Sequence, residues 1–216
     1  MKLGIETSTR NCSVVLWDNM RRFYSREKSE TQFVHAEQLH NMIQEVITEA
    51  NANWRDLEAV VIGRGPGSYT GLRIGVSCAK GICFSLQIPL YSISSLTLMV
   101  QSAPEVRSSK NVLAVMDARR MEVFGGWFDN GRLISTPQAM IFEDHETMDS
   151  EPVEWVIGEN ASKLKDVFDD QVRFLDVLPS ANVMRLLDSD EFFQLEDLAY
   201  FEPEYVKPFI PTISKK

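Results

Sequence analysis

Residues 63–73 read GRGPGSYTGLR, and this glycine-rich run constrains the fold more than any other part of the chain. It follows the apolar run 59–62 and precedes a helical pattern that starts near Leu72. A strand, a glycine loop and a helix N-terminus together make an anion site, because loop N–H groups point outward and the helix dipole attracts negative charge. The run therefore predicts an α/β fold with a place for a phosphate-like group.

The composition is that of an ordinary soluble protein with room for one or two domains. Of its 216 residues, 44% are hydrophobic and 25% are charged, and no apolar run approaches the ~20 residues of a membrane span. The N-terminus reaches Glu6 too soon for a signal peptide. The three cysteines, Cys12, Cys78 and Cys83, form no CxxC pair and indicate reduced thiols. We therefore expect a cytoplasmic protein with no membrane partner.

Charge is distributed unevenly along the chain. The net charge is −9, yet residues 1–110 carry 12 Lys or Arg against 10 Asp or Glu, whereas residues 111–216 carry 10 against 21. An acidic half is a poor partner for phosphate backbones, whose binding depends on clustered Lys and Arg. We expect the chain to reach nucleic acid only through another protein.

Hydrophobic periodicity predicts two related halves, each with three strands followed by helices that alternate with further strands. The first half is expected to contain strands 3–6, 13–17 and 22–26, helix 31–51 capped by Thr31, strand 59–63, helix 72–86, strand 90–93 and a helix from about 94. The second is expected to contain strands 112–117, 122–128, 132–136 and 155–158, a helical stretch at 162–168, strand 172–175 and helix 180–187. Strands that return after helices indicate mixed sheets covered by helices. We predict two lobes, residues 1–105 and a smaller, acidic lobe at 106–216.

Three short segments stand where an actin-like ATPase or sugar-kinase fold places its phosphate contacts. They are residues 6–9, the glycine loop, and residues 117–120. In such folds hydroxyls, glycine N–H groups and an acidic side chain surround a triphosphate and Mg²⁺. The candidate residues for a weak or vestigial nucleotide site are Glu6, Ser8, Thr9, Gly65, Gly67, Ser68 and Asp117. The alternative is that the glycines serve only a turn that needs positive φ.

These segments, taken together, closely resemble the TsaB (YeaZ) family. The matching stretches are residues 5–9 with 12–14, residues 35–39, 63–73, 117–123 and 203–205. The glycine-loop stretch is the most specific of them. Glu6 stands where members of the family usually have Asp, a departure that keeps the charge. The stretch 137–200 matches only loosely.

The resemblance implies an actin-like ATPase or sugar-kinase type fold, with two βββαβα-like lobes of which the second is reduced. It implies a heterodimer with the threonylcarbamoyl transferase TsaD, joined by the ATPase TsaE, that modifies the adenosine beside the anticodon of tRNA. It also implies self-association through the surface used for TsaD. Members of the family are not themselves the transferase, so we expect a non-catalytic scaffold or activator. No cofactor is expected to bind tightly, and ATP or ADP at the heterodimer interface stays open.

The residues independently favour a non-catalytic role. The chain has three histidines, of which His35 and His40 are five apart and therefore point in different directions on a helix. There is no HExxH motif, so we expect no metal site. Its one Gly-Gly pair, residues 125–126, lies within a strand pattern and not at a helix start in the second half. The alternative is a free-standing enzyme, either an actin-like ATPase or a metallopeptidase of the glycoprotease-like superfamily.

The helix after the glycine loop carries small side chains at every fourth position. Gly71, Gly75, Ala79 and Cys83 form a stripe that another helix could approach closely. That helix is either 31–51 of the same chain or a helix of a partner, and both interpretations stay open. The candidate partner-interface residues are His35, Leu39, Met42, Gly71, Gly75, Ala79 and Ile82.

Overall fold

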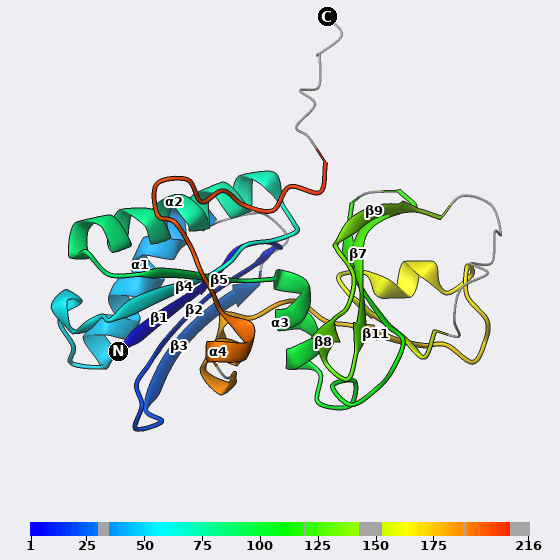
Figure 1. Ribbon diagram of the computed structural model, residues 1–216, viewed down its shortest axis with the longest axis horizontal. Helices are drawn as coiled ribbons and strands as arrows, with labels where there is room; N and C mark the ends of the chain where they lie inside the picture. Colours follow the sequence, from blue (N-terminus) through cyan, green and yellow to red (C-terminus); the bar gives the residue numbers. More distant parts are fainter. Residues whose placement is uncertain (30–34, 119, 143–152, 188, 208–216) are drawn as a thin grey trace, which may run out of the picture.

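The structure is a computed structural model that describes residues 1–29, 35–118, 120–142, 153–187 and 189–207. Two mixed sheets lie side by side, the first covered by two long helices (Figure 1). Within the described ranges, no helix is long and apolar enough to cross a membrane. The expected cap Thr31 lies outside the described residues.

The first sheet combines an antiparallel meander with parallel strands. Its order is β12-β5-β4-β1-β2-β3. The strands are β1 (Lys2–Glu6), β2 (Asn11–Trp17), β3 (Phe23–Ser29), β4 (Ala59–Gly63), β5 (Leu90–Ile93) and β12 (Gln194–Leu195). The parallel strands β1, β4 and β5 lie at its centre, and β4 is buried along its whole length. Strands covered on both faces are apolar at consecutive positions, which is why 59–62 reads as one apolar run.

Helices cover both faces of this sheet. The helices are α1 (His35–Glu49), η1 (Trp54–Asp56), α2 (Tyr69–Leu86), α3 (Ser95–Ser102), η3 (Ala181–Leu186) and α4 (Ser189–Phe192). Side chains alternate along β4, so that Val60 and Ile62 join the core beneath α1 and α2 while Val61 joins the core of the opposite face. In Figure 1, α1 and α2 lie on one side of the first sheet.

The second sheet repeats the scheme with shorter connections. Its order is β11-β10-β6-β7-β8, and β9 also pairs with β7. The strands are β6 (Val112–Asp117), β7 (Glu122–Asp129), β8 (Arg132–Leu133), β9 (Gln138–Ile141), β10 (Trp155–Gly158) and β11 (Arg173–Asp176). Between β10 and β11 the chain has only the 3₁₀ turn η2 (Ala161–Leu164), where the first lobe has the 18-residue α2. The predicted two-lobed actin-like α/β fold with a reduced second lobe is confirmed.

Several expected elements differ in extent. The strand expected at 132–136 is shortened to β8, and a further strand that we did not expect, β9, begins after Pro137, which has no N–H to donate to a ladder. The helical stretches expected at 162–168 and 180–187 are the short 3₁₀ segments η2 and η3. Periodicity of apolar residues does not distinguish one 3₁₀ turn from the start of an α-helix.

The C-terminal segment returns to the first lobe. Strand β12 pairs with β5, and Phe201 is buried in the core beneath α1 and α2. The Lys80 ammonium on α2 donates to the carbonyls of Ala199 (3.2 Å) and Phe201 (3.0 Å). Figure 1 shows this segment, in red, running along α2. Residues 106–216, which we expected to form the second lobe, are therefore divided between the two sheets.

Candidate functional site

The glycine loop packs directly on the turn between β1 and β2. A Cβ on Gly67 would lie 2.3 Å from the Ser8 carbonyl oxygen, and a Cβ on Gly71 would lie 2.2 Å from the Thr7 carbonyl oxygen. The backbone N–H of Ser68 donates to the Ser8 carbonyl at 2.6 Å. No other residue fits at these contacts, and Gly67 also has a φ of +152°. The glycines are thus explained by contact between two segments of the same chain.

Ser68 caps α2 at the end of this loop. Its hydroxyl accepts from the Gly71 N–H at 3.2 Å, which satisfies one of the N–H groups at the helix start. The neighbouring hydroxyl residues Ser8 and Thr9 are each 1% exposed. The predicted loop residues therefore do come together with residues 6–9, at the carboxyl ends of β1 and β4.

Glu6 is completely buried at the same edge of the sheet. One carboxylate oxygen accepts from the Ser8 N–H at 2.6 Å and the other from the Ser95 hydroxyl at 2.8 Å. Burial raises the pKa of Glu6 above its ordinary value, and these hydrogen bonds act in the opposite direction. A Cβ on Gly63 would lie 1.9 Å from the Glu6 carboxylate, so the strand also needs glycine there. Oε2 of Glu6 thus joins β1 to the start of α3, and Oε1 holds the turn that follows β1.

Asp117, the acidic candidate of the second lobe, is paired within its own lobe. It forms an ion pair with Lys163 and accepts from the Asn160 side-chain amide at 2.9 Å. The Lys163 ammonium also donates to the carbonyls of Arg120 (3.0 Å) and Glu122 (2.9 Å). Lys163 was missed from the sequence, because a lysine in a short 3₁₀ turn has no pattern that distinguishes it from a solvated one.

Glu159 adds a further carboxyl beside this ion pair. Burial raises its pKa, and Arg10 from the β1–β2 turn of the first lobe acts against that rise. Asp117 lies close enough to raise the pKa of Glu159 further. The facing parts of the two lobes therefore hold carboxyls and cations that already compensate one another. A phosphate group entering there would compete with these contacts.

His35, which we expected at a partner interface, is a buried structural residue. It is 1% exposed, and its Nε2 lies 2.6 Å from the Thr9 carbonyl oxygen, to which it donates. Burial lowers the pKa of His35, while the hydrogen bond to Thr9 acts in the opposite direction. The imidazole connects the start of α1 to the β1–β2 turn.

The expected partner interface needs correction, since most of its residues are inside the protein. Leu39 and Met42 belong to the core beneath α1 and α2, and Ala79 is fully buried there. A Cβ on Gly75 would lie 2.2 Å from the Thr7 hydroxyl oxygen and 3.2 Å from the Ile62 side chain. The stripe of small side chains therefore faces the first sheet, where it allows α2 to pass close to β1 and β4.

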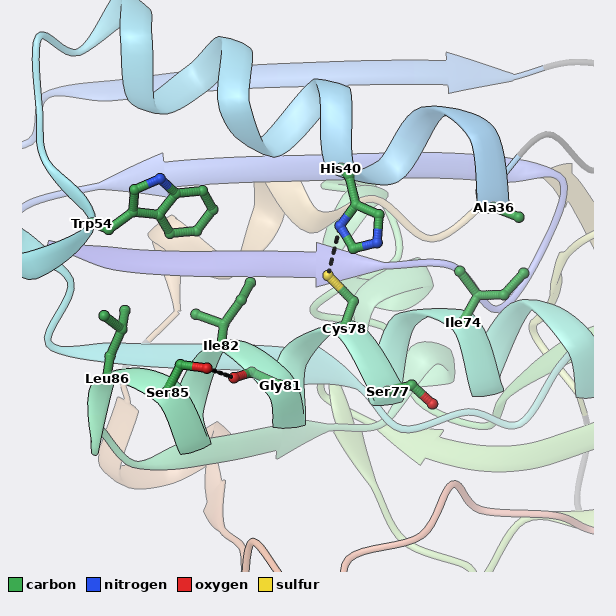
Figure 2. Close-up of a pocket in the computed structure, with 10 residues that line it drawn as sticks. All are labelled: Ala36, His40, Trp54, Ile74, Ser77, Cys78, Gly81, Ile82, Ser85 and Leu86. Atoms are coloured by element: carbon green, nitrogen blue, oxygen red, sulfur yellow. Dashed lines mark hydrogen bonds between the residues drawn. The ribbon is translucent and has the colours of Figure 1, made fainter.

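The surface between the two long helices is an apolar groove. We call it the α1–α2 groove, and it encloses about 720 Å³. It is lined by Ala36, His40, Trp54, Ile74, Ser77, Cys78, Gly81, Ile82, Ser85 and Leu86. Figure 2 shows His40 and Cys78 pointing toward each other at its middle, with Trp54 near one end. Ile82 is the one residue of the expected interface that lines it.

The groove has the open space and the uncharged lining that another apolar surface could pack against. A Cβ on Gly81 would meet no atom within 4 Å, so this part of the groove is open. Cys78 Sγ lies 3.6 Å from His40 Nδ1, and burial raises the pKa of Cys78 to about 11, which keeps it a thiol at neutral pH. Among the residues that the structure describes, no three His, Cys, Asp or Glu side chains form a metal-binding group.

Comparison with known proteins matches both the sequence and the fold. The family model described as TsaD, tRNA N6-adenosine threonylcarbamoyltransferase, matches residues 29–140. The tRNA threonylcarbamoyladenosine biosynthesis protein TsaB of Haemophilus influenzae is 37% identical over 122 residues, which are 56% of this chain and 51% of that protein. This chain thus aligns with about half the length of that relative.

A second relative and a solved structure extend the match. The TsaB protein of Escherichia coli is 32% identical over 160 residues, 71% of this chain and 68% of that protein. The structure of YeaZ from Pseudomonas aeruginosa is 25% identical and superposes with a TM-score of 0.77 over 94% of this chain and 98% of that one. With its glycine loop, its two-lobed fold and these relatives, the chain belongs to the TsaB (YeaZ) family.

Proposed function

We propose that the chain is a non-catalytic subunit in the synthesis of threonylcarbamoyladenosine in tRNA. In this proposal it pairs with a TsaD-type transferase, which carries out the threonylcarbamoyl transfer to the adenosine beside the anticodon. The names of the relatives support the pathway, since TsaB proteins are described by it. The family resemblance supports the remaining parts of the proposal, which are pairing with TsaD, the addition of the ATPase TsaE and contact with tRNA through the complex.

The α1–α2 groove is the observation that carries this proposal. Its walls are mostly apolar, Trp54 at its end is 38% exposed, and Gly81 leaves room for an incoming side chain. A long groove between two helices fits the apolar stripe of a partner's helix. In the absence of the transferase, the same groove would serve a second copy of this chain.

The nucleotide candidates support a scaffold more than an enzyme. Glu6 uses both carboxylate oxygens inside the first lobe, and Asp117 is paired with Lys163. The glycines of the loop are in contact with Thr7 and Ser8. We therefore propose that these residues hold no nucleotide tightly in the isolated chain, and that any ATP or ADP binding beside them needs the partner to complete the site.

Co-purification with the TsaD paralogue of the same organism tests the pairing. Gly81→Arg places a charged chain in the open part of the groove, where its Cβ would meet no atom within 4 Å. We expect it to weaken the heterodimer at least about tenfold, since an arginine would be buried without a partner. Ile134→Arg, at a residue that is 63% exposed in the second lobe, is the matched control and should leave pairing intact. Leu39→Arg is unsuitable, because it would charge the core.

Equal pairing of both variants, measured by light scattering after gel filtration, would overturn the proposed interface. The non-catalytic role is tested separately with the isolated chain. Steady ATP hydrolysis that is lost in Asp117→Asn, a substitution that keeps the shape of the side chain, would favour a free-standing actin-like ATPase. Peptide hydrolysis that depends on an added metal ion would favour the metallopeptidase alternative.

A further inference from the structure

A second pocket lies at the end of the first sheet opposite the glycine loop. Lys2 pairs with Trp17 on one side and with Ala59 on the other, so the β2–β3 turn is at the end where β4 begins. The pocket encloses about 450 Å³ between this turn and η3. We call it the hairpin pocket, and it is lined by Trp17, Asp18, Arg21, Arg22, Phe23, Arg185 and Leu186.

The charge of the hairpin pocket is opposite to that of the chain. Three arginines against one aspartate leave two positive charges, whereas the whole chain has a net charge of −9. The carboxylate of Asp18 is held by Arg22, whose Nε and Nη2 both lie 2.7 Å from Oδ2. Neither Arg21 nor Arg185 forms an ion pair with any residue that the structure describes. Two guanidinium groups are therefore available to an anion.

Local contacts fix the Arg185 side chain and the backbone of the turn that carries Arg21 before any ligand arrives. Asp18 Oδ1 accepts from the N–H groups of Met20 (2.9 Å) and Arg22 (3.0 Å), which fixes the turn. Arg185 donates through Nε to the Asn182 side chain at 2.9 Å, and its guanidinium lies 3.7 Å from the centre of the Phe23 ring. The other N–H groups of the Arg185 guanidinium remain available to donate to a ligand. Such preorganisation reduces the entropy lost on binding.

We propose that the hairpin pocket binds the phosphate group of a nucleotide, with the organic part of the ligand against the aromatic wall. Guanidinium forks match phosphate oxygens in geometry as well as in charge. Phe23, which is 43% exposed, forms an aromatic wall of the kind that accompanies phosphate contacts at RNA-binding surfaces, whereas Trp17 also lines the pocket but is only 9% exposed. The phosphate comes either from an RNA strand or from a free mononucleotide. The site lies away from both the α1–α2 groove and the glycine loop, so it does not depend on pairing with a transferase.

Binding of two probes to the isolated full chain tests this proposal. The probes are a short fluorescent RNA hairpin and AMP, each titrated between about 50 and 200 mM salt. The variant is Arg21→Asn with Arg185→Gln, because the φ of +64° at residue 21 is one that asparagine tolerates. The control, Arg55→Gln with Lys110→Gln, removes the same charge from exposed residues elsewhere.

We expect the pocket variant to bind about tenfold more weakly than the control, and the slope of log affinity against log salt to fall by about 1 to 2. Loss of RNA binding identifies an RNA strand as the source, and loss of AMP binding alone identifies a free nucleotide. Equal binding by variant and control with both probes, or no binding of either probe to the unaltered chain, overturns the proposal. If the double variant does not fold, as judged by circular dichroism, the single Arg21→Asn variant decides, since Arg21 is exposed.

Discussion

Two glycines on α2 should respond in opposite ways to the same substitution. Gly75 and Gly81 are both within the helix, and each Gly→Ala change adds one methyl group. A Cβ on Gly75 would lie 2.2 Å from Thr7 Oγ1, whereas a Cβ on Gly81 would meet nothing within 4 Å. The pair therefore separates helix propensity from packing within one element.

The magnitudes follow from these contacts. At Gly81, alanine removes the conformational cost of glycine and should stabilise the protein by about 0.5–1 kcal/mol. At Gly75 the same gain is opposed by overpacking, which costs about 1–3 kcal/mol. Thr7 has little freedom to move, because it is fully buried and its hydroxyl donates to the Gly71 carbonyl at 2.9 Å. Losing that hydrogen bond adds about 1 kcal/mol, so Gly75→Ala should destabilise by about 1–3 kcal/mol overall.

Urea unfolding of both variants measures the difference in their free energies of unfolding. The slope of that free energy against urea concentration should be the same for each, because neither substitution changes the buried surface greatly. In thermal unfolding, each kcal/mol should shift Tm by about 2–4 °C for a chain of this length. These measurements should be made at low protein concentration, so that self-association through the groove does not add to the measured stability. If Gly75→Ala were as stable as Gly81→Ala, α2 would not pass as close to Thr7 as the structure places it, and the corrected assignment of the small stripe to the sheet would fail.

Three further predictions concern the buried polar contacts. Burial lowers the pKa of His35 in the folded state, so below the ordinary value of 6.5 the unfolded chain binds more protons than the folded chain. The free energy of unfolding should therefore fall as pH decreases through that value. His35→Gln, which keeps an N–H donor, should make the urea midpoint less dependent on pH. Lys163→Met leaves Asp117 without its cation and should destabilise the protein by about 1–3 kcal/mol. Adding Asp117→Asn to Lys163→Met should recover part of that loss. Equal urea midpoints for the single and the double variant would contradict this pairing. Lys80→Met removes two hydrogen bonds to the segment at residues 199–201, so limited proteolysis should cut that segment faster than in Lys110→Met, where an exposed lysine is lost.

The sequence predicted those features that depend on neighbours along the chain. The apolar run 59–62, the glycine loop and the helical pattern after it indicated a strand, a turn and a helix, and α2 begins three residues before Leu72, where Ser68 caps it. The order of elements indicated two related lobes with the second reduced. Hydrogen bonds within a helix and the alternation along a strand act over a few residues, so their patterns are visible without the fold.

The sequence did not indicate which side of each element would be covered. The stripe that includes Gly75 reads the same whether a sheet, a neighbouring helix or a partner lies against it, and only the folded chain assigns it to Thr7. Periodicity did not indicate the short elements α4 and β12, for a different reason. They have too few residues to show a period, and they are positioned by contacts with the first lobe.

Both candidate surfaces were decided by contacts between residues that are distant in sequence. The α1–α2 groove exists because Leu39 and Ala79 turn inward and leave His40 and Gly81 outside. The hairpin pocket brings Arg185 next to Phe23, although an average over the chain shows only an acidic protein. Local chemistry thus determined the secondary structure and the family, whereas the balance of burial over the whole chain decided which residues remained available for a partner or a ligand.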